Sequence, residues 1–174
     1  LFVDGQPVDG FGGALPENEI KAFLQKNGVE PLAPVEEEPE TDPDSPTARL
    51  GSGLAAARRG DVATASEQLN GIPEEEPETA RAKRLLDGLE IFSFEPSDEP
   101  HAADDGLVAG KQAVLAGDFE AAVESFLSSM AEGKEARGAL ARRASVLCFE
   151  FLLEEPNGED VVSGLRRRMA TLLY

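Results

Sequence analysis

The stretch that decides the fold is GLVAGKQAVLAGDFEAAVESFLSSM, residues 106–130. Apolar residues recur in it at three- and four-residue spacing on both sides of Gly117-Asp118, which predicts two amphipathic helices joined by a tight turn. Glycine takes the backbone angles that end a helix, and the aspartate carboxylate caps the next one. The residues expected to follow the inner face of the first helix are Val108, Lys111, Gln112 and Leu115. Those expected on the second are Ala122, Val123, Phe126, Leu127 and Met130.

The same pattern occurs once more, earlier in the chain, without a gap. Gly53, Gly60, Asp61, Val62, Ala65 and Leu69 have the spacing of Gly110, Gly117, Asp118, Phe119, Ala122 and Phe126. Small residues let antiparallel helices approach closely, and such a hairpin must stack on others to bury its apolar face. The pattern resembles tetratricopeptide repeats; the alternative is an ordinary helical bundle with glycine turns. The residues expected to pack the repeats are Gly53, Gly60, Ala65, Leu69, Gly110, Gly117, Phe119, Ala122 and Phe126.

The composition excludes several classes of partner. The formal net charge is -18 at pH 7, which argues against nucleic acid or an anionic membrane surface as the main partner. No stretch approaches the roughly 18–20 apolar residues of a membrane span. Much of the negative charge lies in residues 31–46, whereas the arginines lie in the helical segments. The helical part is therefore more balanced in charge than the whole chain.

No catalytic or metal-binding constellation is found in the sequence. Cys148 is the single cysteine and His101 the single histidine, which excludes an internal disulfide and a cysteine-based zinc site. We expect Cys148 to be a small buried residue and His101 to lie in a solvated loop. No Gly-rich phosphate loop is present, so we expect no cofactor and no enzymatic activity from this chain.

Residues 1–30 differ in kind from the rest of the chain. They predict a strand at Leu1–Val3, a turn at Asp4-Gly5, a returning strand at Val8–Phe11 and a helix from about Pro16 to Gly28. The sequence LFVDGQPVDGFGGALPENEIKAFL resembles the last two strands and the final helix of a thioredoxin domain. We therefore expect a ββα remnant of an N-terminally truncated thioredoxin-like domain. The Cys-X-X-Cys helix of that family is absent from this sequence, so the chain itself is not expected to exchange disulfides.

Residues 31–46 form an acidic, Pro-rich linker, or alternatively an acidic interaction tail. Residues 47–174 are expected to form the helical domain, which makes the fold mainly α. Its first hairpin starts at Ser45-Pro46 and its second helix ends near Leu69. A helix over 79–92 should pack on this hairpin, and a helix over 135–154 should keep Arg137, Arg142 and Arg143 outside. The residues of the 135–154 helix that are expected to face the core are Leu140, Ala144, Leu147, Cys148, Phe151 and Leu152.

The C-terminal helix, 159–174, ends in GLRRRMATLLY. This ending and the order of parts resemble the bacterial chaperedoxin family of YbbN or CnoX type. The resemblance implies a cytoplasmic, redox-linked holdase that binds unfolded or oxidised client proteins and passes them to the GroEL chaperonin. It also implies that the C-terminal helix contacts the chaperonin. The residues it places in that contact are Leu165, Arg166, Arg167, Arg168, Met169, Leu172, Leu173 and Tyr174.

Other interpretations stay open at the level of sequence. The intact protein could be chiefly a thioredoxin-like disulfide oxidoreductase, with this part as an interaction scaffold. The helices could also bind one dedicated peptide in a groove. The C-terminal helix carries a stripe that suits a cap on its own domain as well as a docking element. That stripe consists of Val162, Leu165, Met169, Leu172 and Leu173.

Overall fold

The computed structural model describes residues 42–173 apart from Ser97, Pro100 and Lys134, and a few positions nearer the N-terminus: Phe2, Val3, Gln6, Pro7, Phe23 and Lys26. The chain divides into two units, Leu1–Thr41 and Asp42–Tyr174. We call the second the helical unit.

In the first unit, strands β1 (Phe2–Val3) and β2 (Gln6–Pro7) pair antiparallel. The predicted hairpin is thus present at its start, but the chain pairs directly after Asp4-Gly5 and not first at Val8. Phe23 and Lys26 are helical. The rest of the predicted returning strand and helix lies outside the described residues, so the likeness to a thioredoxin domain stays a prediction.

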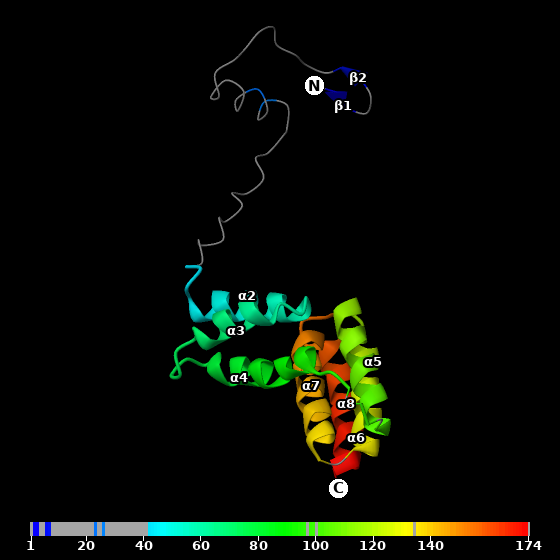
Figure 1. Ribbon diagram of the computed structural model, residues 1–174. Coiled ribbons are helices and arrows are strands. Elements are labelled where there is room, and N and C mark those ends of the chain that lie inside the picture. The colour runs from blue at the N-terminus through cyan, green and yellow to red at the C-terminus, as the bar shows by residue number, and fades with distance from the viewer. Residues whose placement is uncertain are drawn as a thin grey trace. The chain divides into compact units, whose positions relative to one another are not determined.

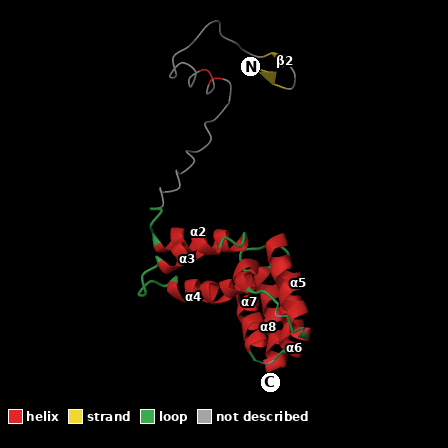
Figure 2. Ribbon diagram, viewed as in Figure 1, coloured by secondary structure: helices red, strands yellow, loops and turns green. Residues whose placement is uncertain are grey.

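The helical unit consists of α-helices and one 3-10 helix joined by short connections (Figures 1 and 2). Helices α2 to α4 lie side by side and run across the direction of α5 to α8 (Figure 1). The mainly α fold predicted from the sequence is confirmed. The elements are α2 (Pro46–Arg58), α3 (Val62–Asn70), α4 (Thr79–Gly88), the 3-10 helix η1 (Leu89–Ser93), α5 (Ala102–Ala116), α6 (Phe119–Glu132), α7 (Ala136–Leu152) and α8 (Gly158–Leu173).

Both Gly-Asp turns form as predicted. Gly60 and Gly117 have positive φ angles of 72° and 79°, a conformation that glycine adopts without steric cost. Asp61 accepts a hydrogen bond from the Thr64 amide at 3.1 Å, and Asp118 accepts one from the Ala121 amide at 3.0 Å. These caps start α3 and α6 two residues after each glycine.

The two hairpins also share their closest contact. A Cβ on Gly53 would lie 2.6 Å from Leu69 Cγ, and a Cβ on Gly110 would lie 2.2 Å from Phe126 Cε1. In each hairpin the glycine therefore makes room for the large apolar residue sixteen positions later. The alanines at the matched position, Ala65 and Ala122, are fully buried.

The predicted inner face of α5 is wrong. Leu115 is 52% exposed, Gln112 is exposed, and Val108 and Lys111 are only half-buried. The buried face instead holds Ala103, Leu107, Gly110 and Val114. A close helix crossing requires the least bulky side of the helix at the contact, and this outweighs a stripe of larger apolar residues. Gly110, on the correct face, was the informative residue.

Helix α7 is the centre of the helical unit, and all six residues predicted to face inward from it are buried. Helix α4 packs on α3, as expected, but more extensively on α7. At that crossing a Cβ on Gly88 would lie 2.5 Å from Leu147 Cβ. The predicted helix over 79–92 changes to 3-10 geometry from Leu89, and the one over 135–154 ends at Leu152.

Ion pairs between buried carboxylates and partly exposed arginines join α7 to its neighbours. Glu150 is 1% exposed, and its carboxylate accepts hydrogen bonds from Arg81 Nε and Arg84 Nε, both at 2.7 Å. Asp104, also buried, is bound by Arg137. Arg137 was expected on the outside, and neither buried carboxylate was anticipated, because a lone acid in a helix predicts solvent exposure.

Arg58 connects the first hairpin to the second. Its guanidinium lies 5.0 Å from the ring centroid of Phe119 and 5.8 Å from that of Phe151. It also donates to the Phe151 carbonyl at 3.1 Å and pairs with Glu155. The cation thus bridges the end of α2, the start of α6 and the end of α7, a position where cation–π contact and charge pairing add.

Candidate protein-binding surface

The turn before α8 fixes where this helix starts. Asn157 has a positive φ of 61°, which asparagine tolerates better than most residues. A Cβ on Gly158 would lie 1.8 Å from the Leu152 carbonyl oxygen, so only glycine fits there. Pro156-Asn157-Gly158 therefore separates α7 from α8, as the sequence predicts.

Only part of the predicted stripe of α8 is buried. Val162 and Leu165 are buried and Met169 is half-buried against the core. Leu172, however, is 41% exposed, so the stripe does not stay inside to the end of the helix. The side chain of Leu173 and all of Tyr174 lie outside the described residues. Helix α8 packs against α6 and α7.

The three consecutive arginines of α8 have different surroundings, although all are exposed. Arg168 forms a two-pronged ion pair with Glu124 of α6. Arg166 lies over the Phe149 ring, 5.4 Å from its centroid. Arg167 has no ion-pair partner among the described residues. Arg168 therefore fastens the helix, whereas Arg166 and Arg167 remain available to an external group.

A hollow of about 520 Å³ runs along the outer side of α8. Ser163, Arg166, Arg167 and Ala170 follow i, i+3, i+4, i+7 spacing and so share one face of the helix. Leu153, from the turn after α7, is exposed beside them. We call these five residues the α8 outer surface. Glu159, an exposed acid one turn before Ser163, lines the same hollow, so two cations and apolar area lie there beside one carboxylate. Arginine is enriched in surfaces that bind protein partners.

The sequence identified the arginines of this surface but not Leu153, Ser163 or Ala170. The helical spacing to Arg166 and Arg167 could have indicated Ser163 and Ala170. Leu165 and Met169, which the resemblance placed in the contact, face the core instead. Leu172 lines a separate hollow of about 340 Å³ between α6 and α8, next to Arg168.

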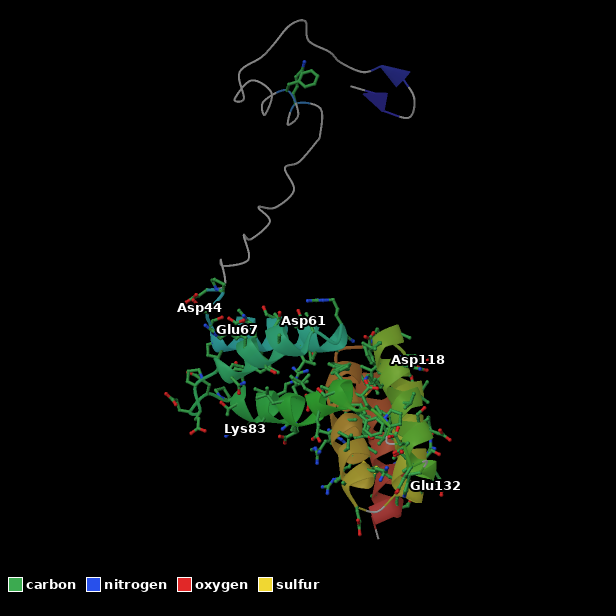
Figure 3. All side chains as sticks on the ribbon, viewed as in Figure 1. Asp44, Asp61, Glu67, Lys83, Asp118 and Glu132 are labelled. Atoms are coloured by element: carbon green, nitrogen blue, oxygen red, sulfur yellow. The ribbon has the colours of Figure 1, made fainter. Side chains whose placement is uncertain are left out.

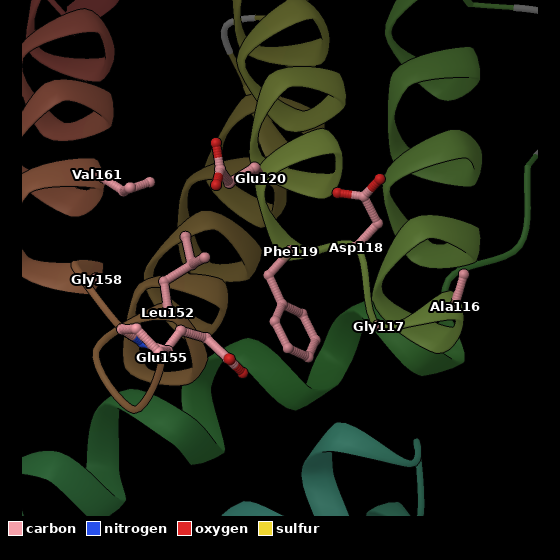
Figure 4. A pocket seen from close by; sticks show the side chains of 10 residues that line it. Ala116, Gly117, Asp118, Phe119, Glu120, Leu152, Glu155, Gly158 and Val161 are labelled. Atoms are coloured by element: carbon pink, nitrogen blue, oxygen red, sulfur yellow. The ribbon is translucent and has the colours of Figure 1, made fainter.

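A third hollow, of about 460 Å³, lies where the Gly117 turn meets the turn before α8 (Figure 4). Phe119, Leu152 and Val161 supply its apolar lining, and Glu120 lies across from Val161 (Figure 4). Of its other carboxylates, Asp118 caps α6 and Glu155 pairs with Arg58. These carboxylates have structural partners.

The two side chains best suited to covalent or metal chemistry, Cys148 and His101, have structural roles. Cys148 is fully buried, and burial raises the pKa of its thiol far above the usual range, so it is not a thiolate nucleophile at neutral pH. His101, predicted in a solvated loop, is exposed but caps α5: its Nδ1 accepts a hydrogen bond from the Ala103 amide at 3.0 Å. The described part of the chain contains no group of three or more metal-ligating side chains.

Exposed acidic side chains lie elsewhere on the helical unit, among exposed cations such as Arg59, Lys83 and Arg142. Among the labelled residues in Figure 3, Asp61, Glu67, Asp118 and Glu132 project from the surface, and all are exposed. Arg166 and Arg167 are two adjacent exposed cations on α8, and the exposed acids Glu159 and Asp160 lie about two turns before them.

No protein-family model, no curated protein and no solved structure matches this chain. Among the helices of the described residues, none has the length and apolarity that crossing a membrane requires.

Proposed function

We propose that this chain is the protein-binding module of a chaperedoxin-like protein, built from tetratricopeptide-like hairpins. In this proposal it holds unfolded or oxidation-prone clients in the cytoplasm and hands them to the GroEL chaperonin. The observation that carries the proposal is the α8 outer surface, where Arg166 and Arg167 lie exposed beside Leu153 and Ala170. The resemblance of the GLRRRMATLLY ending supplies the identity of the partner.

The shared geometry of the two hairpins supports the repeat part of the proposal. Equivalent glycines admit Leu69 and Phe126, and equivalent Gly-Asp turns set the length of each first helix. Repeats of this kind present extended surfaces for protein partners. The helical unit then serves as a rigid support that keeps α8 in a fixed orientation.

The test is binding of the 174-residue chain to GroEL, measured by biolayer interferometry. Replacing Arg166 and Arg167 by glutamate should weaken binding at least tenfold. The change removes two cations that would attract an acidic contact on the partner and puts in their place two carboxylates that would repel it. The matched control replaces Arg142 and Arg59 by glutamate. Both are exposed cations on other helices or turns, with no ion-pair partner among the described residues.

Unchanged GroEL binding by the Arg166 and Arg167 variant would refute the docking role of α8. A second assay addresses the holdase function: the chain should suppress heat-induced aggregation of an unfolding client, and this activity should survive the arginine replacements. A chain that binds one stoichiometric peptide partner and no unfolded client would favour the scaffold interpretation instead.

A further inference from the structure

The outermost side of α8 has a charge pattern that complements itself. Asp160, Gly164 and Arg167 lie at three- and four-residue spacing, opposite the buried Val162 and Leu165. Asp160 and Arg167 are exposed, and neither has an ion-pair partner within the described residues. A Cβ added to Gly164 would meet nothing within 4 Å. This side of the helix is thus unpartnered and open.

We infer that this side of α8 pairs with the same side of a second copy of the chain, antiparallel about a two-fold axis near Ser163 and Gly164. Asp160 and Arg167 are seven residues apart, about two helical turns or 10 Å. Because the axis lies midway between them, each Asp160 meets Arg167 of the other copy. A two-fold interface requires a patch that is complementary to itself, and this stripe satisfies that condition.

Charge order favours a second copy over another occupant. A partner of one charge sign would face attraction at one end of the stripe and repulsion at the other. A parallel pairing would place like charges together. The smallest residues, Ser163 and Gly164, lie at the crossing point, where they let the two backbones approach.

The association is expected to be weak. The interface consists of one face of one helix from each copy, so the area it buries is well below the roughly 1,200 Å² buried in stable complexes. Self-association is a property separate from the proposed function, but it affects the proposed docking. Pairing covers Arg167, so self-association and docking of a chaperonin exclude each other on the same helix.

The test is sedimentation equilibrium of the 174-residue chain from about 10 µM to about 1 mM at about 150 mM salt, which screens the long-range repulsion between two chains of net charge -18 more than it screens a close ion pair. The average mass should rise above that of the monomer over this range. Asp160→Arg and Arg167→Asp should each raise the dissociation constant about tenfold, because each places like charges opposite one another twice. The double variant Asp160→Arg, Arg167→Asp restores both pairs and should recover association to within about threefold.

The matched control reverses two exposed charges away from α8, Glu132→Arg with Arg142→Asp, and should leave association unchanged. Gly164→Gln gives a second measure: no atom of its own chain crowds the new side chain, so the helix should persist while association falls. Helicity at 222 nm checks that each variant folds.

A chain that stays monomeric at 1 mM would overturn the inference, as would a double variant no better than the singles. The double variant also separates this inference from the proposed function. It should recover self-association, but it should not recover binding to GroEL, because Arg167 is still lost.

Discussion

The contact between Gly110 and Phe126 offers the sharpest test of how the hairpins pack. In Gly110→Ala the new Cβ would lie 2.2–2.7 Å from three atoms of the Phe126 ring. Phe126 is fully buried, so the ring cannot swing into solvent. Overpacking costs about 1–3 kcal/mol, and a clash with three atoms of a buried ring belongs in the upper part of that range, about 2–3 kcal/mol, of which the better helix propensity of alanine offsets about 1 kcal/mol. We expect a net loss of about 1–2 kcal/mol in the free energy of unfolding.

Gly51→Ala is the matched control, because it also replaces a helical glycine by alanine but meets nothing within 4 Å. It should raise the free energy of unfolding by about 0.5–1 kcal/mol. The chain has no tryptophan, so urea unfolding is best followed by circular dichroism at 222 nm. The two variants should move the urea midpoint in opposite directions, by about 0.3–1 M.

A double-mutant cycle isolates the steric cause. Phe126→Leu removes ring atoms from the contact, so Gly110→Ala should destabilise that background less than it destabilises the original chain. If Gly110→Ala stabilised the protein as Gly51→Ala does, the close approach of α5 and α6 would be refuted. Equal costs of Gly110→Ala in both backgrounds would show that Phe126 is not the obstacle.

Three further outcomes follow from buried groups. Glu150→Ala should lower the free energy of unfolding by about 2–3 kcal/mol in urea titrations, because Arg81 and Arg84 lose a buried partner, whereas Glu154→Ala, at an exposed carboxylate, should cost under about 1 kcal/mol. Hydrogen bonding from Arg137 lowers the pKa of Asp104, so the Asp104 carboxylate stabilises the folded chain fully above about pH 5, and this stabilisation is lost as the pH falls through the lowered pKa. The difference in free energy of unfolding between the original chain and Asp104→Asn should therefore shrink below about pH 4. Asp105→Asn, at an exposed position in the same turn, is the control. Cys148 should react with a maleimide at pH 8 about 1,000-fold more slowly in the folded chain than in urea, and equal rates would contradict its burial.

Local features of the fold were predictable because local chemistry sets them. The Gly60 and Gly117 turns depend on a positive φ, and the Asp61 and Asp118 caps depend on an amide three residues away. Contacts between distant segments gave little sequence signal. Glu150 is indistinguishable from a surface acid until α4 brings Arg81 and Arg84 to it.

The candidate surface shows the same division. The sequence determined that α8 is amphipathic and carries three arginines, since spacing and charge are fixed by the order of residues. Only the tertiary structure decided that Arg168 is held by Glu124 while Arg167 is left outside. It likewise decided that the glycine side of α5, and not its Leu115 side, faces the core. Which face of a helix is buried depends on the shape of its neighbour, and a single helix does not contain that information.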